Sequence, residues 1–318
     1  MHPPAWWARD GALPRLLAPA AAVVAAATAR RVARPGWRAP VPVICCGNVA
    51  AGGAGKTTVA LDLARRLRAR GVAVHVLSRG YGGRARGVLR VDPAAHGAGL
   101  VGDEPLLLAE AAPTWVGADR AAAARAAVSA GAGALLMDDG LQNPGLVKDV
   151  SLLVVDGAVG FGNGRVMPAG PLREPAAAGA ARCRAAVLIG ADRAGARDAL
   201  PVGLPVLRAS LSAEGAVAGR RVLAFAGIAR PSKFWETLAA AGAEVAGRAA
   251  FPDHHPYTVA EVERVLARAA ALGAEPVTTP KDAVRLPPPL RARVGVVGVR
   301  LLWEDEAALD AMLREAVP

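Results

Sequence analysis

Short apolar runs alternate with segments of helical periodicity along most of the chain. Between residues 41 and 156 the clearest runs are "VPVICC", "AVHVLS", "GALLM" and "VSLLVVD". Continuous apolar runs of this length are typical of strands that are buried on both faces. The clearest helix runs from Thr57 to Arg70 and is closed by Gly71. The pattern predicts an α/β fold in which helices cover both faces of a parallel sheet.

A second series of strands and helices begins after about residue 210, with "RVLAFAGI", "PSKFWETLAAAG" and "TVAEVERVLARAAALG". A chain of 318 residues is long enough for two cores. We therefore expect a larger domain at 39–215 and a smaller C-terminal α/β domain at 216–318, preceded by a separate segment at 1–38.

The segment 1–38 has the pattern of a helix that lies on a membrane. Trp6 and Trp7 precede an apolar run from Leu16 to Ala29, and four arginines follow it. The run is shorter than the roughly 20 residues that span a bilayer, and its charge lies on the wrong side for a signal peptide. We expect an interfacial, membrane-associating helix with its arginines on anionic lipid. The alternative is an alanine-rich helix that packs on the core and has a solvated basic end.

Charge and composition limit the classes of molecule that this protein can bind. The net charge of +11 and the isoelectric point near 10.8 indicate an anionic partner. Aromatic residues make up only 4% of the chain and are not interleaved with basic runs, which argues against nucleic acid. Cys45, Cys46 and Cys183 have neither metal-ligand spacing nor a disulfide pattern. We expect them to be core residues in a reducing compartment.

The first strand-to-helix junction, "GNVAAGGAGKTT", resembles a phosphate-binding loop. Its glycines let backbone amides approach phosphate oxygens, Lys56 can reach the β- and γ-phosphates, and Thr57 can bind Mg²⁺. The usual first glycine is replaced by Ala50. We expect an ATP site with Mg²⁺, and the predicted nucleotide-binding residues are Gly52, Gly53, Ala54, Gly55, Lys56, Thr57 and Thr58.

Asp138 and Asp139 follow the apolar run "GALLM". Ligands of open α/β sheets collect at the carboxyl ends of the strands, so this pair is a candidate for the acidic residues that hold the metal. The alternative is two acids in an ordinary turn.

Four other polar clusters interrupt the pattern. "SRGYGGR" suits contact with phosphate or sugar, or is a plain turn, and Asp103 in "VGDEP" either has a chemical role or caps a helix. "GNGRVMPAGPLREP", which contains Glu174, is a rigid functional loop or a crossover. In "FPDHHPY" adjacent histidines should point in different directions, which favours one orienting or general-base histidine over a metal site.

Taken in order, these motifs carry a resemblance. "GNVAAGGAGKT", "SRGYGG", "GDEP", "DDGLQ", "GNGRVMPAGPLREP", "FPDHH" and "TTPKDAVRL" resemble the tetraacyldisaccharide 4'-kinase family of lipid A biosynthesis over about residues 40–290. The family's loop also lacks the first glycine. The resemblance implies a P-loop kinase that transfers the γ-phosphate of ATP to the 4'-hydroxyl of a tetraacylated glucosamine disaccharide 1-phosphate. It also implies a peripheral protein at the cytoplasmic face of the bacterial inner membrane. No obligate protein partner is evident from the sequence.

The resemblance also assigns roles to residues. Lys56 and Thr57 match the phosphate and Mg²⁺ positions, Asp103 the carboxylate that activates the acceptor hydroxyl, and His254 the histidine paired with it. Because Asp103 and His254 fall in different predicted domains, the site should lie between them. The residues matching the metal site are Thr57, Asp138, Asp139 and Glu174.

The chain departs from the family pattern at Asn143, where histidine is frequent, and at Pro280, where glutamate is frequent. We expect the first to alter nucleotide or metal contacts and the second to stiffen a strand end. A membrane-associated P-loop ATPase of the partitioning or targeting type, which needs no lipid acceptor, is the alternative class. Its loop carries a signature lysine where this chain has Ala51.

Overall fold

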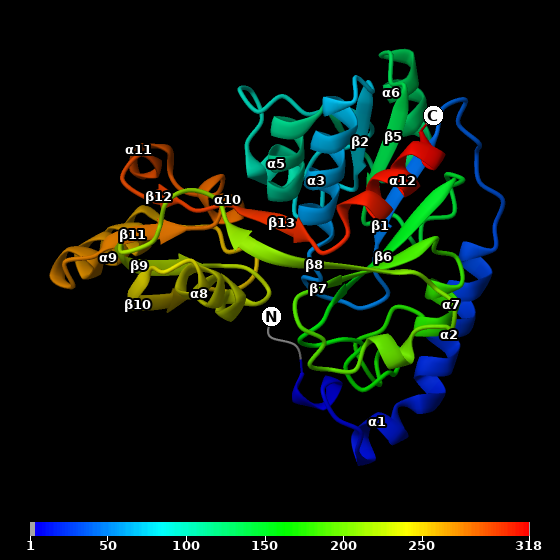
Figure 1. Ribbon diagram of the computed structural model, residues 1–318, viewed down its shortest axis with the longest axis horizontal. Helices are drawn as coiled ribbons and strands as arrows, with labels where there is room; N and C mark the ends of the chain where they lie inside the picture. The colour runs from blue at the N-terminus through cyan, green and yellow to red at the C-terminus, as the bar shows by residue number, and fades with distance from the viewer. Residues whose placement is uncertain (1–3, 318) are drawn as a thin grey trace.

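The computed structural model describes residues 4–317, which form two β-sheets with helices packed against them (Figure 1). In this part of the chain the larger sheet has nine strands in the order β13-β8-β7-β6-β1-β5-β2-β4-β3. Neighbouring strands are parallel except for the pairs β8–β13 and β3–β4. The strands are β1 (Val43–Gly47), β2 (Val74–Ser78), β3 (Leu89–Arg90), β4 (Thr114–Val116), β5 (Ala134–Asp138), β6 (Val150–Asp156), β7 (Ala185–Ile189), β8 (Val206–Ala213) and β13 (Val299–Trp303).

Helices cover both faces of the larger sheet. Alternate residues of β1 enter different cores, Ile44 and Cys46 on one face and Val43 and Cys45 on the other. The first face packs against α3 (Lys56–Ala69), α5 (Asp103–Ala111) and α12 (Glu306–Ala316). The opposite face packs against α2 (Ala18–Val32), α6 (Arg120–Ser129) and α7 (Ala176–Ala180). The predicted α/β fold with a covered parallel sheet is confirmed.

The cysteines are core residues, as the sequence predicts. Cys45 and Cys46 are fully buried, and Cys183 packs at the edge of the core beside α7. Burial raises the pKa of the Cys45 thiol to about 12, so this thiol is protonated and unreactive at neutral pH.

The smaller sheet has the order β10-β9-β11-β12, and all its pairs are parallel. Its strands are β9 (Arg221–Ala226), β10 (Glu244–Ala250), β11 (Glu275–Thr278) and β12 (Gly295–Val296). Its helices are α8 (Pro231–Ala240), α9 (Val259–Ala271), α10 (Pro280–Ala283) and α11 (Pro288–Arg291). Thr258 and Glu261 begin α9 with a reciprocal capping box, which explains the sharp start of that helix.

The chain returns from the smaller sheet to the larger one. The expected boundary between residues 215 and 216 falls between β8 and β9, which belong to different sheets. β13 pairs antiparallel with β8, and Figure 1 shows the two strands side by side where the two units join. Trp303 and Leu309 lie in the core of the larger sheet. Residues 299–317, expected in the smaller domain, therefore pack with the larger one, because an apolar periodicity does not specify which core it joins.

The N-terminal segment folds as η1 (Ala5–Trp7), α1 (Ala12–Leu16) and α2, along the outside of the larger unit (Figure 1). Ala21 and Thr28 of α2 are buried against that unit. Leu16 and Val23 are instead 76% and 69% exposed. Among residues 4–317 no helix has the length and apolar character needed to cross a membrane. The segment is thus partly core-packed and partly apolar on its outer side. The remaining short helices are α4 (Ala98–Val101) and η2 (Arg197–Ala199).

Candidate active site

The loop between β1 and α3 has the geometry of a phosphate site. Gly52 and Gly55 have φ values of 116° and 95°, which glycine adopts without strain. A Cβ on Gly55 would lie 2.7 Å from Ile189 Cδ1, so the end of the Ile189 side chain would have to shift. α3 begins at Lys56, so its unpaired N–H groups and the positive end of its dipole face the loop. These donors suit a bound phosphate.

The alanine at the first glycine position has a structural explanation. Ala50 forms an isolated antiparallel bridge with Leu172, and Ala51 N donates to Pro171 O at 2.8 Å. Ala50 does not have a positive φ. The segment that carries "PAGPLREP" therefore holds the start of the loop in extended backbone, where alanine is as suitable as glycine.

Lys56 and Asp139 lie together beside the loop. Lys56 Nζ is 3.1 Å from Asn48 Oδ1 and 3.7 Å from Asp139 Oδ1. Arg173 holds Asp139 through two parallel hydrogen bonds, Nη1 to Oδ1 at 2.8 Å and Nη2 to Oδ2 at 3.2 Å. Burial acts to raise the pKa of Asp139, but the charges of Lys56 and Arg173 outweigh burial and lower it. Asp139 is therefore a carboxylate paired with two cations.

Thr57 and Asp138 form the part of the site that fits a metal ion. Thr57 Oγ1 donates to Asp138 Oδ2 at 3.2 Å, and Asp138 Oδ1 is buried without a hydrogen-bond partner among the described residues. Burial, followed by the negative charge of Glu104, raises the pKa of Asp138 to about 7. Residues 4–317 contain no cluster of three or more His, Cys, Asp or Glu that would bind a metal by itself. Mg²⁺ often takes one or two protein ligands and completes its shell with phosphate and water, which these two residues fit.

Glu174 joins two loops. Its Oε1 accepts from Gln142 Nε2 at 2.8 Å and from Arg182 Nη2 at 2.7 Å, and 3% of its side chain is exposed. Within residues 4–317 it makes no hydrogen bond to Thr57 or Asp138. The structure thus ties Glu174 to Arg182 and the loop after β5, apart from the pair that fits Mg²⁺.

Asp103 and His254 lie in contact although 151 positions separate them. Asp103 begins α5 directly after Gly102, whose φ is 90°, and its side chain is 2% exposed. His254 also has a positive φ, 57°, and its N–H donates to Gly227 O at 3.0 Å. His254 Nδ1 lies 3.0 Å from Asp103 Oδ2. The ring of Tyr81, from "SRGYGG", is 5.4 Å from the His254 ring.

His255 points away from this pair. Its Nε2 lies 3.1 Å from Glu261 Oε2, and its ring is 5.0 Å from the Phe251 ring. The prediction that the adjacent histidines diverge is confirmed. The cause is the left-handed turn at His254 and not strand alternation, because both residues follow the end of β10.

Each member of the Asp103–His254 pair stabilises the charged form of the other. Burial acts to raise the pKa of Asp103, but the hydrogen bond to His254 and the charges of Lys281, His254 and Arg285 outweigh burial and lower the pKa. The hydrogen bond to Asp103 raises the pKa of His254. A carboxylate that is buried, ionised and oriented by a histidine is suited to general-base chemistry.

Lys281 connects this pair electrostatically to the loop. Its Nζ donates to Glu104 Oε1, so an ion pair links α10 of the smaller unit to α5 of the larger one. The charges of Glu104 and Lys281 act on Asp138, and that of Lys56 acts on Glu104. The Asp103–His254 pair and the phosphate loop therefore belong to one site.

The two departures from the expected pattern take ordinary structural positions. Asn143 Oδ1 accepts from Gly145 N at 2.9 Å, which closes a turn. Pro280 is the first residue of α10 after its cap Thr279, a position where proline needs no N–H partner. Pro280 thus begins a helix, whereas we expected it to stiffen the end of β11.

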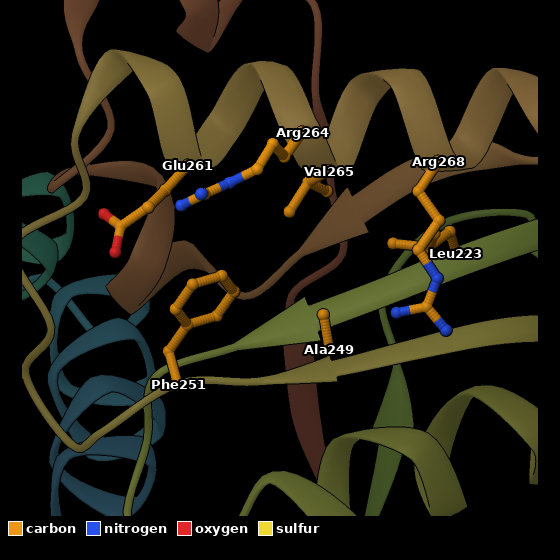
Figure 2. A pocket seen from close by; sticks show the side chains of 7 residues that line it. All are labelled: Leu223, Ala249, Phe251, Glu261, Arg264, Val265 and Arg268. Atoms are coloured by element: carbon orange, nitrogen blue, oxygen red, sulfur yellow. The ribbon is translucent and has the colours of Figure 1, made fainter.

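One pocket lies apart from this site. It has a volume of about 190 Å³ and sits between α9 and the β9–β10 strands, with Phe251, Arg264 and Arg268 among its walls (Figure 2). None of the predicted site residues lines it.

Several residues of the site were missed by sequence reasoning. Gln142 stands in a quoted motif, and Lys281 and Arg285 stand in "TTPKDAVRL", but their types alone gave no reason to single them out, and Arg173 stood out only as part of the "PLREP" loop, without a role. Arg182 lies in an alanine-rich stretch that gives no signal. Their partners come from other elements, so only the fold reveals them.

A parallel sheet that presents a phosphate loop at its first strand, and a buried carboxylate and histidine brought to that loop from two units, define a P-loop phosphotransferase. The particular family follows from comparison with known proteins. Residues 13–318 match the family described as "LpxK: Tetraacyldisaccharide-1-P 4'-kinase". The chain belongs to this family of kinases.

The chain is similar to its relatives over nearly their full lengths. It is 62% identical to the tetraacyldisaccharide 4'-kinase of Gluconacetobacter diazotrophicus, covering 98% of this chain and 97% of the relative. It is 59% identical to that of Rhodospirillum centenum, covering 98% and 95%. A crystal structure of the "apo" form of LpxK from Aquifex aeolicus in complex with ATP matches 96% of this chain and 100% of its own, with a TM-score of 0.76 and 25% identity. Family membership sets aside the partitioning or targeting ATPase.

Proposed function

We propose that this protein transfers the γ-phosphate of ATP to the 4'-hydroxyl of a tetraacylated glucosamine disaccharide 1-phosphate, a step of lipid A biosynthesis. The observation that carries the proposal is the contact between Asp103 and His254 at 3.0 Å across the two units, a pair that Glu104 and Lys281 connect electrostatically to Lys56 of the phosphate loop. A buried carboxylate oriented by a histidine suits the activation of an acceptor hydroxyl. The family's name supports the choice of acceptor.

In this proposal each residue has a defined step. Asp103 accepts the proton of the 4'-hydroxyl, and His254 orients the carboxylate. The hydroxyl oxygen then forms a bond to the γ-phosphorus while the bond from that phosphorus to the β-phosphate bridging oxygen breaks, which leaves ADP. Lys56 and the loop amides stabilise the charge of the transferring group.

We also propose that Thr57 and Asp138 hold Mg²⁺. When bound with the nucleotide, the ion would neutralise part of the phosphate charge. The support is the buried Asp138 Oδ1, which has no protein partner among the described residues, next to the Thr57 hydroxyl. Asp139 and Glu174 are tied to arginines in the structure, so for them a metal role requires those pairs to open.

The metal proposal predicts unequal effects for the two adjacent aspartates. We expect Asp138→Asn to move the Mg²⁺ dependence of transfer to concentrations at least about tenfold higher, with the KM for the disaccharide unchanged. Asp139→Asn should move it less, because Arg173 already holds that carboxylate. Titrating the activity of each variant with Mg²⁺ measures both shifts in Mg²⁺ dependence. An unchanged titration for Asp138→Asn would remove this residue from the metal site.

We propose further that the protein acts as a peripheral protein at the cytoplasmic face of the bacterial inner membrane. Along α2, Ala20, Val23, Ala27 and Arg30 share one helical face and are all exposed. Leu16 precedes this face and is 76% exposed. An apolar strip that ends in arginines suits an anionic lipid surface, where the acylated substrate would reside.

This proposal predicts that vesicle binding depends on the outer side of the N-terminal helices. We expect the double variant Leu16→Asp, Val23→Asp to bind anionic vesicles at least about tenfold more weakly, because two exposed aliphatic side chains no longer enter the lipid. Its unfolding temperature should not change, since neither side chain is buried. Val202→Asp, at a fully exposed valine elsewhere, is the control. Equal binding by the double variant and the control would favour the purely core-packed helix.

The proposed activity has a direct test. The purified protein is incubated with Mg-ATP and a tetraacyl disaccharide 1-phosphate, and the lipid is analysed by mass. We expect the addition of one phosphate. ATP hydrolysis that is unaffected by the lipid, with no change in lipid mass, would refute the proposal.

A further inference from the structure

Arg285, from the smaller unit, reaches the Asp103–His254 pair. It lies just after α10, and 7% of its side chain is exposed. Its Nε donates to Lys281 O at 3.0 Å and lies 3.3 Å from Asp103 Oδ2 as an ion pair, at the oxygen that His254 Nδ1 approaches at 3.0 Å. One carboxylate oxygen of the larger unit is therefore held between two side chains of the smaller one.

The same guanidinium holds the backbone around His254. Arg285 Nη2 donates to Gly227 O at 3.0 Å, and Nη1 donates to His255 O at 3.1 Å. Gly227 O also accepts the backbone N–H of His254 at 3.0 Å. A histidine with a φ of 57° keeps that conformation only if its surroundings enforce it. Arg285 supplies two of the contacts that do so.

Asp282 fixes Arg285 in turn. Its side chain is fully buried, and its Oδ1 accepts from Arg285 Nη2 at 2.9 Å, from Tyr257 Oη at 2.6 Å and from Gly227 N at 2.7 Å. Its Oδ2 accepts from Thr279 Oγ1 at 2.5 Å. A buried carboxylate with this many donors, opposite a planar guanidinium, forms a rigid anchor. The network runs from the core of the smaller unit to Asp103.

We propose that Arg285 is a positioning residue for phosphoryl transfer, which fixes the Asp103 carboxylate and the His254 turn relative to each other across the two units. The inference rests on the proposed function, in which Asp103 accepts the proton of the acceptor hydroxyl. The role needs a guanidinium, because Nη1 and Nη2 donate to two backbone carbonyls while the same planar group pairs with the Asp103 carboxylate. A lysine keeps the charge without this planar geometry.

The charge of Arg285 has a second consequence. The charged groups that face Asp103 are His254, Lys281, Arg285 and the neighbouring Glu104. Burial acts to raise the pKa of Asp103, and the hydrogen bond and positive charges together lower it. Arg285→Gln removes one of those charges, so the pKa of Asp103 should rise. The acid limb of the kcat/KM profile, where the base becomes protonated, should therefore move to higher pH.

The test compares Arg285→Gln, Arg285→Lys and the double variant Arg285→Gln, Asp282→Asn in the full chain. Loss of Arg285 alone leaves the buried Asp282 carboxylate without its cation, which destabilises the fold. The double variant removes both buried charges, so it tests the role of Arg285 if the single variant does not fold. Arg248→Gln, at an exposed arginine of β10, is the matched control. The readouts are the unfolding temperature, the ATP dissociation constant, and kcat and kcat/KM against pH.

We expect kcat to fall about 10²-fold in Arg285→Gln and in the folded double variant, with ATP affinity and the control unchanged. Arg285→Lys should keep the acid limb of the wild-type protein but not its kcat. Wild-type kcat and an unmoved acid limb in the folded double variant would overturn the inference, as would a loss of ATP affinity equal to the loss of kcat. If the wild-type protein itself adds no phosphate to the disaccharide, the proposed function fails first.

Discussion

Replacing Lys56 with alanine is expected to lower phosphoryl transfer by about 10³-fold. Lys56 begins α3 at the phosphate loop, and its ammonium is the positive charge that can follow the γ-phosphate as it moves to the acceptor. The fold should persist, because among residues 4–317 the side chain makes one hydrogen bond, to Asn48 Oδ1, and one ion pair, with Asp139. Two measurements separate a loss of catalysis from a loss of folding: the mass of the lipid product and the unfolding temperature of the variant.

Arg65→Ala serves as the control for this variant. Arg65 is a cation of the same helix, but it is exposed and pairs with Glu214 on the surface. It should lose little activity or stability. Near-normal transfer by Lys56→Ala, or an equal loss in Arg65→Ala, would contradict the assignment of the nucleotide site.

Asp103→Ala and His254→Ala are each expected to lower turnover by about 10² to 10⁴-fold while ATP binding is retained. Their contact at 3.0 Å makes them one functional unit, so the double variant should lose little more than the worse single variant. Residues that acted independently would instead multiply their losses. Single-turnover transfer and ATP binding, measured on all three variants, provide the comparison.

His255→Gln is the control for this pair. His255 lies next in the chain but contacts Glu261 and the ring of Phe251. Its replacement should affect the unfolding temperature more than turnover. The pair is disproved if the double variant shows the full product of the two single losses, or if His255 proves to be the critical histidine.

The parts of this molecule that the sequence predicts well depend on local chemistry. The strand "VPVICC", the glycine loop and the helix behind it appear where expected, because buried strands, φ-permissive glycines and helix ends leave marks in adjacent residues. The Asp103–His254 contact was expected only through family resemblance. Nothing near either residue in sequence indicates the other.

The parts that the sequence could not predict depend on pairing between distant elements. The sequence makes Asp139 a candidate metal ligand and the family resemblance adds Glu174, yet Arg173 and Arg182 hold these carboxylates in the structure. The residues around an arginine in an alanine-rich stretch do not indicate its ion-pair partner, which only the folded structure shows. The return of α12 to the larger sheet was missed for a similar reason, since its apolar face fits either core.

The insertion of the smaller unit between β8 and β13 constrains the order in which a newly synthesised chain can finish folding. The edge of β8 lacks its antiparallel neighbour until residues 299–303 have been made, and Leu309 and Leu313 complete the core beneath α3 only after that. The smaller unit, which ends near residue 298, therefore emerges completely from the ribosome before β13 and α12 can complete the larger unit. A chain that stops after residue 298 would carry its phosphate loop on a sheet with an exposed edge and an open core, a state prone to aggregation.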